Sequence, residues 1–366
     1  MRILFVGDYS NLHATLAAEI KRLGHEVDVL SDRCRYMDTH SDIYLKRLPG
    51  FKGSIKYLYD LFSILPSLKD YDAVQLINPN FFSLRPGKIK YFFQRLKEQN
   101  NKIFLTLAGN DYYFCKACYD AKIFRFSEFK IGNKFTEFHT ATPERLYGWI
   151  SHDNNKWNQY LYENIDGAMA VLPEYDMVAR PILGDKVAFT NLPIDFSSLP
   201  QPIYSANMPV KIFIGMRSGM EIQKGTKKLL GMAKELEKNH PGKIIVEKVS
   251  DLPLSTYLDR MNNSHIVLDQ LYAYSPAMNA LYAMALGKVA ATGAQPEYYE
   301  YIGNPETKPI FSLSPLDTDI EERILELAAH PEHIISLGKE SRELVKANND
   351  SKIVAAKFLH HWENSL

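Results

Sequence analysis

The chain has 366 residues, of which 46% are hydrophobic and 23% are charged, and its 43 basic side chains balance 43 acidic ones. This is the composition of an ordinary globular protein, so it excludes an intrinsically disordered chain, and the zero net charge argues against wholesale nucleic-acid binding. At about 150 residues per domain, the length predicts two domains. The three cysteines are an odd and sparse set, which fits a reducing compartment better than a disulfide scaffold.

The start of the chain and its apolar stretches bear on location. Residues 1–7 run directly into a strand-like pattern and lack the order of regions that is typical of a signal peptide. The uncharged stretch between Asp269 and Lys288 contains polar residues and a proline, so it predicts a strand end, a loop and a buried helix rather than a membrane span. We therefore expect a cytoplasmic protein.

The first half of the chain alternates short apolar runs with helical periodicity. Ile3 to Val6 predict a buried strand that ends at Gly7, and apolar residues at spacings of three and four then predict a helix that ends at Gly24. A second strand at 27–30 completes a βαβ unit, whose natural consequence is a parallel sheet. The other elements expected in this half are strands at 73–77, 103–107 and 168–172, and helices after Pro86 and near 157–164.

The region from Asn191 to Pro209 is the predicted linker, because it places four prolines among small polar residues. After it, the pattern restarts with a strand at 210–214 that ends at Gly215. The further elements expected are strands at 244–249, 266–268 and 289–291, and helices at 225–237, 278–286, 351–362 and, as a pair, within 317–348. Two such units predict two Rossmann-like domains, residues 1–200 and 205–348, with the carboxyl ends of their strands facing a common cleft.

The loop after the first strand does not support a dehydrogenase. A dinucleotide-binding fingerprint requires Gly-x-Gly-x-x-Gly, so that the backbone can approach a pyrophosphate. Gly7 is followed by Asp8, Tyr9, Ser10 and Asn11, without a second or third glycine. Hydride transfer therefore loses most of its support.

The corresponding loop of the second domain carries positive charge. Arg217 follows the strand that ends at Gly215, and Lys224, Gly225 and Thr226 open the next helix. Two cations beside a helix N-terminus can neutralise a diphosphate while backbone N–H groups hold its oxygens. The spacing alone leaves the alternative open that these are exposed side chains on an irregular loop.

A motif follows further along, where Ala283-Met284-Ala285-Leu286-Gly287-Lys288 precedes residues 289–297, which end in Gln-Pro-Glu. Together with Arg217 and the Lys224-Gly225 pair, this order resembles the C-terminal half of retaining GT-B glycosyltransferases of the group 1 type. That family usually carries Glu-x7-Glu ending in Glu-Ala-Met-Ala-x-Gly-Lys-Pro, and then Gly-Gly-x-Pro-Glu. The resemblance covers most of residues 210–303 and extends more loosely over the first half. The fold class that it implies is α/β of the GT-B type.

The resemblance implies roles for several residues. Arg217 and Lys224 would hold the donor diphosphate and stabilise the leaving nucleotide, which is the main electrostatic contribution expected when a glycosidic phosphate bond breaks. Gly293 matches the first glycine of the Gly-Gly-x-Pro-Glu turn and Ala294 replaces the second. Glu297 keeps the acidic position, although a helix-capping carboxylate is an equally ordinary interpretation. The family typically needs no metal, so the expected ligand is the nucleotide-diphosphate sugar itself, as a substrate.

Both glutamates of the family motif are replaced. Tyr282 stands where a glutamate usually holds the ribose hydroxyls, and Tyr274 stands where a glutamate usually contacts the donor sugar. A tyrosine hydroxyl forms hydrogen bonds but lacks the charge of a carboxylate. Asp269, Gln270 and Asn279 flank the segment and are candidates to substitute, with helix capping as the alternative for Asn279. The donor base and sugar are therefore left open.

Two residues of the first half are candidates for the acceptor side. His13 lies just inside the first helix, near the position where a histidine removes the acceptor proton in related inverting GT-B enzymes; a plain helix-face histidine is the alternative. Gly109-Asn110-Asp111 resembles the His-Gly-x-Asp loop that many group 1 enzymes place beside the acceptor, with Ala108 in the place of the histidine. Asp111 is accordingly a candidate for contact with an acceptor hydroxyl.

Cys115 and Cys118 have the spacing of half a metal site. A four-ligand site requires a second pair, which the sequence lacks, so we interpret these cysteines as structural and expect no metal.

The first half is also locally basic. Residues 85–134 contain 11 Lys and Arg against 4 Asp and Glu, and residues 54–71 interleave lysines with apolar residues. Such a face could rest on anionic headgroups at the inner membrane face, near a lipid-linked acceptor, and a solvated surface is the alternative. No nucleic-acid-binding motif accompanies the charge.

We therefore expect a glycosyltransferase that moves a sugar from a nucleotide-diphosphate donor, held by the C-terminal domain, to an acceptor hydroxyl on the N-terminal side. Retention of configuration, a glycan or lipid-linked acceptor in bacterial surface polysaccharide synthesis, and the packing of helix 351–366 back onto the first domain follow from the resemblance alone. Two alternatives stay open. One is a nucleotide-sugar 2-epimerase of the same fold, and the other is a degenerate transferase that acts as a binding or assembly subunit.

Overall fold

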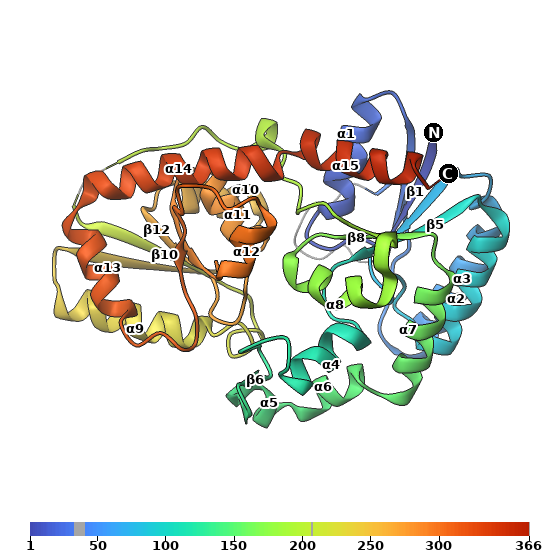
Figure 1. The fold of residues 1–366 in the computed structure, drawn as a ribbon, viewed down its shortest axis with the longest axis horizontal. Helices are drawn as coiled ribbons and strands as arrows, with labels where there is room; N and C mark the ends of the chain where they lie inside the picture. Colours follow the sequence, from blue (N-terminus) through green and yellow to red (C-terminus); the bar gives the residue numbers. More distant parts are fainter. Residues whose placement is uncertain (33–40, 206–207, 366) are drawn as a thin grey trace. The chain divides into compact units, whose positions relative to one another are not determined.

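The structure, a computed structural model, describes residues 1–32, 41–205 and 208–365. The chain divides into two compact units. Unit 1 comprises Met1–Ile123, Glu144–Pro193 and Ser351–Leu366, and unit 2 comprises Phe124–Pro143 and Ile194–Asp350. Each unit is built around one parallel sheet with helices on both faces (Figure 1).

Unit 1 has a seven-stranded parallel sheet in the order β3-β2-β1-β4-β5-β8-β9. Its strands read as apolar runs because both faces are covered. In register, Ile3 of the interior strand β1 pairs with Val27 of β2 on one side and with Ala73 of β4 on the other. The strands are β1 Arg2–Val6, β2 Glu26–Ser31, β3 Ile43–Tyr44, β4 Ala73–Leu76, β5 Lys102–Leu107, β8 Gly167–Ala170 and β9 Val187–Phe189.

The helices of unit 1 pack on both faces of this sheet, with α15 beside α1 and with α2, α3 and α7 on the other side (Figure 1). They are α1 Leu12–Arg22, α2 Gly50–Ile64, α3 Pro86–Gln99, α4 Tyr112–Asp120, α6 Pro143–Trp149, α7 His152–Asn164, α8 Pro173–Leu183 and α15 Ser351–Glu363. The last helix is tied to the core of unit 1 by Trp362. Its indole N–H donates to Gln75 Oε1 at 3.0 Å, and its ring packs 5.9 Å from that of Phe5.

Unit 2 has a five-stranded parallel sheet in the order β11-β10-β12-β13-β14. The strands are β10 Val210–Met216, β11 Ile244–Ser250, β12 Ile266–Leu268, β13 Val289–Thr292 and β14 Phe311–Ser312. The helices are α9 Thr226–Asn239, α10 Leu254–Asn262, α11 Met278–Ala285, α12 Pro296–Tyr301, α13 Ile320–Ala329 and α14 Pro331–Asn349, with α9 on one face and α10 and α11 on the other (Figure 1). Because the chain moves outward in both directions from β10, the topological switch point lies between β10 and β12.

A segment from the first half of the sequence belongs to unit 2. Residues 124–143 form a small antiparallel hairpin, β6 Lys130–Ile131 with β7 Lys134–Phe135, and the short helix α5 Glu137–Ala141. We refer to residues 124–143 as the bridging segment.

The expected alternation of strands and helices is confirmed by the structure, including Gly24 in a left-handed conformation at the end of α1. The passage from unit 1 to unit 2 at Pro193–Ile194 lies within the predicted linker. Residues 194–205 belong to unit 2 instead of forming a free linker, since Ile203 N donates to Asn262 Oδ1 at 3.1 Å. The boundary that we drew at residue 200 thus differs from the observed division, which also transfers the bridging segment to unit 2.

Among the helices in the described ranges, none combines the length and the apolar character needed to cross a bilayer.

Candidate functional site

The predicted donor residues gather around the carboxyl edge of the sheet of unit 2. In register, Ile214 of β10 pairs with Leu268 of β12, which pairs with Ala291 of β13, so these three strands end level with one another. Their following loops begin at 217, 269 and 293. In open α/β sheets, ligands bind beyond the carboxyl ends of the strands at the switch point. The structure therefore brings the predicted donor residues to the edge where such sheets bind ligands.

The loop after β10 presents the two predicted cations. Arg217 and Lys224 are both half-buried. The loop is braced by its own backbone, because Lys224 N donates to Met220 O, and by the next loop, because Leu271 N donates to Lys224 O, each at 3.0 Å. Within the described ranges, the Lys224 ammonium group has no hydrogen-bonding or ionic partner from the protein. Its charge is accordingly available to a ligand.

Two glycines let this loop pack closely. A Cβ at Gly215 would lie 1.7 Å from the hydroxyl of Tyr257, and a Cβ at Gly225 would lie 2.9 Å from Leu271. Gly225 also has φ 73°, a left-handed conformation that favours glycine, and it directly precedes Thr226, the first residue of α9. Gly215 is thus required by the packing of the end of β10 against Tyr257, and Gly225 by the conformation of the loop.

Asp269 and Asn279 form a closed polar network instead of a free pair. Asp269 is buried, and it accepts hydrogen bonds from Asn279 Nδ2 at 2.9 Å and from the Thr292 hydroxyl at 3.0 Å. Tyr257 in turn donates to Asn279 Oδ1 at 2.6 Å, and burial, with the charge of Asp269, raises the pKa of that tyrosine. Asn279 does not cap α11, since the residue before the helix is Ala277. A contact of Asp269 or Asn279 with the donor stays a prediction.

Tyr274 holds the bridging segment. Its buried hydroxyl accepts hydrogen bonds from Arg125 N at 2.5 Å and from Phe126 N at 3.3 Å, and its ring stacks on Phe126 at 4.6 Å. Burial raises the pKa of this hydroxyl. Tyr282, the second tyrosine in place of a glutamate, is half-buried on α11. A donor contact by either tyrosine stays a prediction, and for Tyr274 the observed bonds give its hydroxyl a structural role.

Arg125 connects the bridging segment to the loop after β13. Its guanidinium group makes a two-point ion pair with Glu297, at 2.5 and 3.1 Å, and donates to Gln295 Oε1 at 3.2 Å. Burial alone would raise the pKa of Glu297, but the hydrogen bond and the charge of Arg125, together with a backbone hydrogen bond, outweigh it and the pKa is lowered. Glu297 is therefore a carboxylate at neutral pH, and 48% of the Arg125 side chain remains exposed at this edge.

No local pattern in the sequence indicates a role for Arg125. Its partners Gln295 and Glu297 lie 170 and 172 residues away in the chain, and no motif links them. The excess of positive charge over residues 85–134 was the only related signal. A third tether was equally hidden: Gln223 Nε2 donates to Glu128 Oε1 at 2.9 Å. The bridging segment thus contacts all three loops of this edge.

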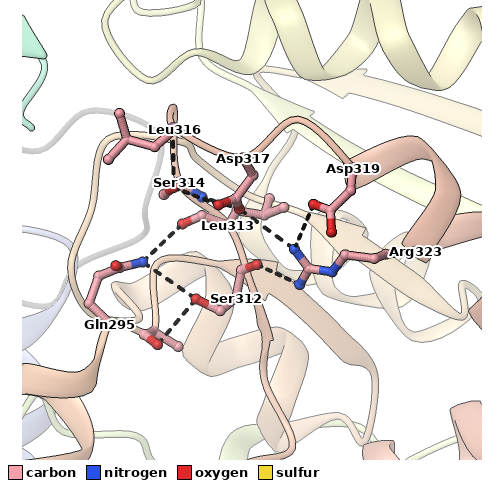
Figure 2. A network of polar contacts seen from close by, with 9 residues as sticks. Gln295, Ser312, Leu313, Ser314, Leu316, Asp317, Asp319 and Arg323 are labelled. Atoms are coloured by element: carbon pink, nitrogen blue, oxygen red, sulfur yellow. Dashed lines mark hydrogen bonds and ion pairs between the residues drawn. The ribbon is translucent and has the colours of Figure 1, made fainter.

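Figure 2 shows what holds Gln295 on its other side. Its Nε2 group points to Ser312 Oγ at 3.4 Å and to Leu313 O at 3.5 Å, and Ser312 Oγ donates to Ala294 O. Arg323 donates to Ser312 O at 2.9 Å and lies 3.6 Å from the carboxylates of Asp317 and Asp319. The turn between β13 and α12 is therefore fixed to the end of β14.

In unit 1, His13 is fully buried. Its Nδ1 faces Gly7 O at 2.7 Å and therefore donates, while Nε2 accepts from the Thr106 hydroxyl at 3.0 Å. Thr106 itself accepts from Gln75, so a chain of hydrogen bonds runs through the core. Burial lowers the pKa of His13 to about 3, which leaves the ring neutral. This geometry favours the structural interpretation of His13, and its action as a base stays a prediction.

Asp111 caps a helix. Its carboxylate accepts from Phe114 N at 2.7 Å, at the start of α4, and from the Tyr162 hydroxyl at 2.9 Å. The group is buried, and burial raises its pKa. Both carboxylate oxygens therefore have partners from the protein, and a contact between Asp111 and an acceptor hydroxyl stays a prediction.

Asp8 is a candidate that the sequence analysis passed over. It directly follows Gly7 at the carboxyl end of β1, and it accepts from His13 N at 3.0 Å and Ala14 N at 3.2 Å. Burial raises its pKa to about 6, against several backbone hydrogen bonds that lower it. A carboxyl group that titrates near neutrality at such an edge is a candidate for proton transfer. Its position immediately after the first strand was the available signal.

The cysteines lie apart from these groups of residues. Cys115 and Cys118 are buried free thiols on α4, and Cys34 lies outside the described residues. In the described part of the chain, no three His, Cys, Asp or Glu side chains come together as a metal-binding group.

Comparison with known proteins defines the class of fold. The sequence matches no protein-family model and no curated protein. Solved structures match it over its whole length, among them sucrose-phosphate synthase from Thermosynechococcus elongatus, with 13% identity and a TM-score of 0.66 over 100% of this chain and 99% of that one. Two others are the lipopolysaccharide outer core galactosyltransferase WaaB (13%, TM-score 0.55, 100% of both chains) and a putative UDP-N-acetylglucosamine 2-epimerase from Listeria monocytogenes (9%, TM-score 0.56, 98% and 94%).

These likenesses, at such low identities, are likenesses of fold. The chain has the GT-B architecture of two parallel α/β units, as the sequence predicted.

Proposed function

We propose that this protein is a glycosyltransferase that moves a sugar from a nucleotide-diphosphate donor to an acceptor hydroxyl. The observation that carries the proposal is the cationic loop at the switch point of unit 2. Arg217 and Lys224 lie on this loop, which leads into α9, a helix with no acidic residue in its first turn. Sucrose-phosphate synthase and the galactosyltransferase WaaB resemble this chain in fold over its whole length. This likeness supports the same class of reaction.

The chemistry requires a positive site beside the leaving group. The bond between the anomeric carbon and the donor phosphate oxygen breaks, and negative charge develops on the departing nucleoside diphosphate. Arg217, Lys224 and the positive end of the α9 dipole would stabilise that charge. A bond forms from the acceptor oxygen to the anomeric carbon, and the hydroxyl proton leaves with the diphosphate or passes to a carboxylate. Lys224 is the best placed of these groups, because no described residue competes for it.

On the acceptor side we propose unit 1, with Asp8 as the group that takes part in proton transfer. Asp8 lies two residues beyond the end of β1, and burial raises its pKa to about 6. We assign His13 a positioning role, since its backbone N–H donates to Asp8 while its ring is used inside the core. Asp111 is retained as a second acceptor-side candidate at the end of β5.

Recognition of the donor would use the groups at the edge of unit 2 that remain partly exposed. Tyr282 and Asn279 lie on α11, and in our proposal they bind the nucleoside. Arg125 and Glu297, paired with each other, take the sugar. The loop after β10 and its junction with α9 are shaped by Gly215, Gly225 and Thr226. Asp269 fixes the orientation of Asn279 by accepting a hydrogen bond from it.

The finer assignments rest on the resemblance of the sequence motif. They are retention of anomeric configuration, and a glycan or lipid-linked acceptor in bacterial surface polysaccharide synthesis. A galactosyltransferase of the lipopolysaccharide outer core among the structural neighbours supports this choice of acceptor. An epimerase among them keeps a nucleotide-sugar 2-epimerase as the second candidate. The degenerate, non-catalytic alternative is favoured only by the two tyrosines.

Incubation of the purified protein with a panel of nucleotide sugars tests the proposal. Each sugar is supplied with and without a glycan acceptor, and products are separated by chromatography and identified by NMR. A transferase releases nucleoside diphosphate in step with a new glycosidic bond, and only when the acceptor is present. Conversion of the donor to an epimer without acceptor would establish the second candidate. Binding of nucleotide sugar without turnover under either condition would favour the binding subunit.

A further inference from the structure

Helix α2 of unit 1 carries a stripe of exposed apolar side chains. The side chains are spaced three or four residues apart, so they share one face of the helix. Their exposed fractions are 81% for Phe51, 53% for Ile55, 70% for Tyr59 and 50% for Phe62. Single exposed apolar residues are ordinary on protein surfaces, but a contiguous row marks a surface that contacts something. The opposite face of the same helix is the one that packs, through Tyr57 and Leu61, which are buried.

The apolar surface continues beyond the helix at its C-terminal end. At the C-terminal end, the ring of Phe62 lies 5.6 Å from that of Tyr91 on α3, and Tyr91 is itself 44% exposed. In Figure 1, α2 and α3 lie beside each other in unit 1. We call these residues the aromatic face: Phe51, Ile55, Tyr59, Phe62 and Tyr91.

Positive charge accompanies the aromatic face. Helices α2 and α3 together contain six Lys and Arg against one Asp and one Glu, although the whole chain is neutral. Asp60 is paired with Lys56 on the same helix, and Glu98 with Arg95. Lys52 and Lys88 are exposed, and neither has an acidic partner within the described ranges. The surface is therefore both apolar and cationic.

We propose that the aromatic face of unit 1 rests on an anionic phospholipid bilayer. Aromatic side chains insert at the level of the headgroups, while lysine side chains extend along the apolar surface and place their charges among the lipid phosphates. Each lysine near an anionic surface adds to the attraction, which decays within a Debye length. A second copy of this chain is a poorer occupant, since a two-fold contact would bring two positive faces together.

The proposal does not depend on the proposed function, because it concerns a surface outside the donor loop and needs no turnover. It does give an acceptor attached to lipid a physical reason to meet unit 1. Failure of one proposal therefore leaves the other to be judged by its own experiment.

Vesicle flotation of the full chain tests the proposal. The vesicles contain either phosphatidylcholine alone or phosphatidylcholine with phosphatidylglycerol. We expect binding to the anionic vesicles and loss of that binding in 0.5 M salt, on the order of tenfold, as the charges are screened. The double variant Phe51→Gln/Tyr59→Gln should lose binding by a similar factor, on the order of tenfold, through loss of apolar insertion. Both residues are mostly exposed, so glutamine, a good helix former, leaves the packed face of α2 intact.

Two controls separate this surface from the rest of the molecule. Tyr147→Gln removes an aromatic side chain on α6 of the same unit with a comparable exposed fraction of 48%, and Lys238→Ala removes a well-exposed charge on α9. Both controls should float like the original protein. Equal binding to neutral vesicles, no binding to either kind, or unchanged binding of the double variant would overturn the proposal. So would a change in sedimentation coefficient of the double variant, since it would identify a protein contact instead.

Discussion

The two units begin with the same order of elements, but they differ in the charged groups at the N-terminus of the first helix. In each, the first strand of the sheet leads through a glycine into a loop and then into a helix: β1 to α1 in unit 1, and β10 to α9 in unit 2. At α1, the protein supplies its own anion, because Asp8 accepts hydrogen bonds from the N–H groups of His13 and Ala14. At α9, Gly225 precedes the helix without a side-chain cap, and no acid stands in the first turn.

This difference indicates which helix lacks a carboxyl group of its own at its N-terminus. The N-terminus of a helix favours negative charge, and that of α1 is already served by a carboxyl group. That of α9 is accompanied by two cations, Arg217 and Lys224, in place of a carboxylate. Two loops of the same topology therefore differ in whether the negative charge comes from the protein or from a ligand. Four experiments test the comparison, each from one side of it.

The largest effect should come from the cations of unit 2. The double variant Arg217→Ala/Lys224→Ala removes two charge-assisted contacts to the donor diphosphate, and we expect affinity for UDP and other nucleoside diphosphates to fall by about 100-fold or more. Isothermal titration calorimetry measures the loss. Lys238→Ala, at the far end of α9, is the matched control and should keep its affinity. An unchanged affinity of the double variant would show that the diphosphate binds elsewhere.

The second test removes the internal anion of unit 1. The folded-state pKa of Asp8, about 6, is raised above its ordinary value of 3.8, so this group stabilises the fold below about pH 4 and that contribution is lost as the pH rises through 6. By pH 7 the loss is on the order of 3 kcal/mol. We expect Asp8→Asn to match the original protein at pH 4 and to be the more stable of the two at pH 7.

Tryptophan fluorescence can follow this unfolding in unit 1 alone. All three tryptophans, Trp149, Trp157 and Trp362, belong to that unit. Urea titrations at pH 4 and pH 7 give the two stabilities for each protein. Parallel pH dependence of the two would contradict a raised pKa. A gain in stability of the original protein over Asp8→Asn between pH 4 and pH 7 would mean that the ionised cap stabilises α1.

The third test concerns the hydrogen bonds that attach the bridging segment to the edge of unit 2. Tyr274→Phe removes the hydroxyl that accepts from Arg125 N and Phe126 N, and a buried unpaired amide costs about 1–3 kcal/mol. Hydrogen exchange at those two amides should therefore become faster, by about tenfold or more. Tyr282→Phe, on the same stretch of chain, is the control and should leave these amides unchanged. Equal protection in Tyr274→Phe would mean that the stacked rings alone hold the bridging segment.

The smallest effect comes from giving α9 an anion of its own. Lys227→Asp places an acid in the first turn, which should stabilise the helix by about 0.3–1 kcal/mol and weaken nucleoside diphosphate binding by several-fold. Thermal unfolding and calorimetry should thus move in opposite directions. Lys238→Asp, near the C-terminus of the helix, should instead lower stability slightly and leave binding alone. If Lys227→Asp strengthened or left unchanged the binding, the N-terminus of α9 would not face the diphosphate.

The periodic parts of the chain were predictable, and the contacts that fill the site were not. Strands such as Ile3–Val6 and Val210–Ile214 are continuous apolar runs, and burial on both faces of a parallel sheet requires that pattern. The cationic loop was visible as well, because Arg217 and Lys224 stand close to a strand and a helix start.

The remaining parts depend on pairs that are distant in sequence. Tyr274 and Glu297 could be read against a family motif, but their partner Arg125 lies in the other half of the chain. The local sequence pattern also did not indicate that His13 is buried. His13 has the sequence environment of a surface helix residue, and only the packing of Phe5 and Thr106 around it lowers its pKa.

The placement of Trp362 sets an order on biosynthesis. Most of unit 1 precedes unit 2 in the chain, yet the indole that bonds to Gln75 and packs on Phe5 belongs to Trp362, which is translated after the whole of unit 2. Unit 2, apart from the early bridging segment, is synthesised in one stretch, so it can fold while the chain is still growing. The half of the molecule that is translated first is therefore the last to complete its core.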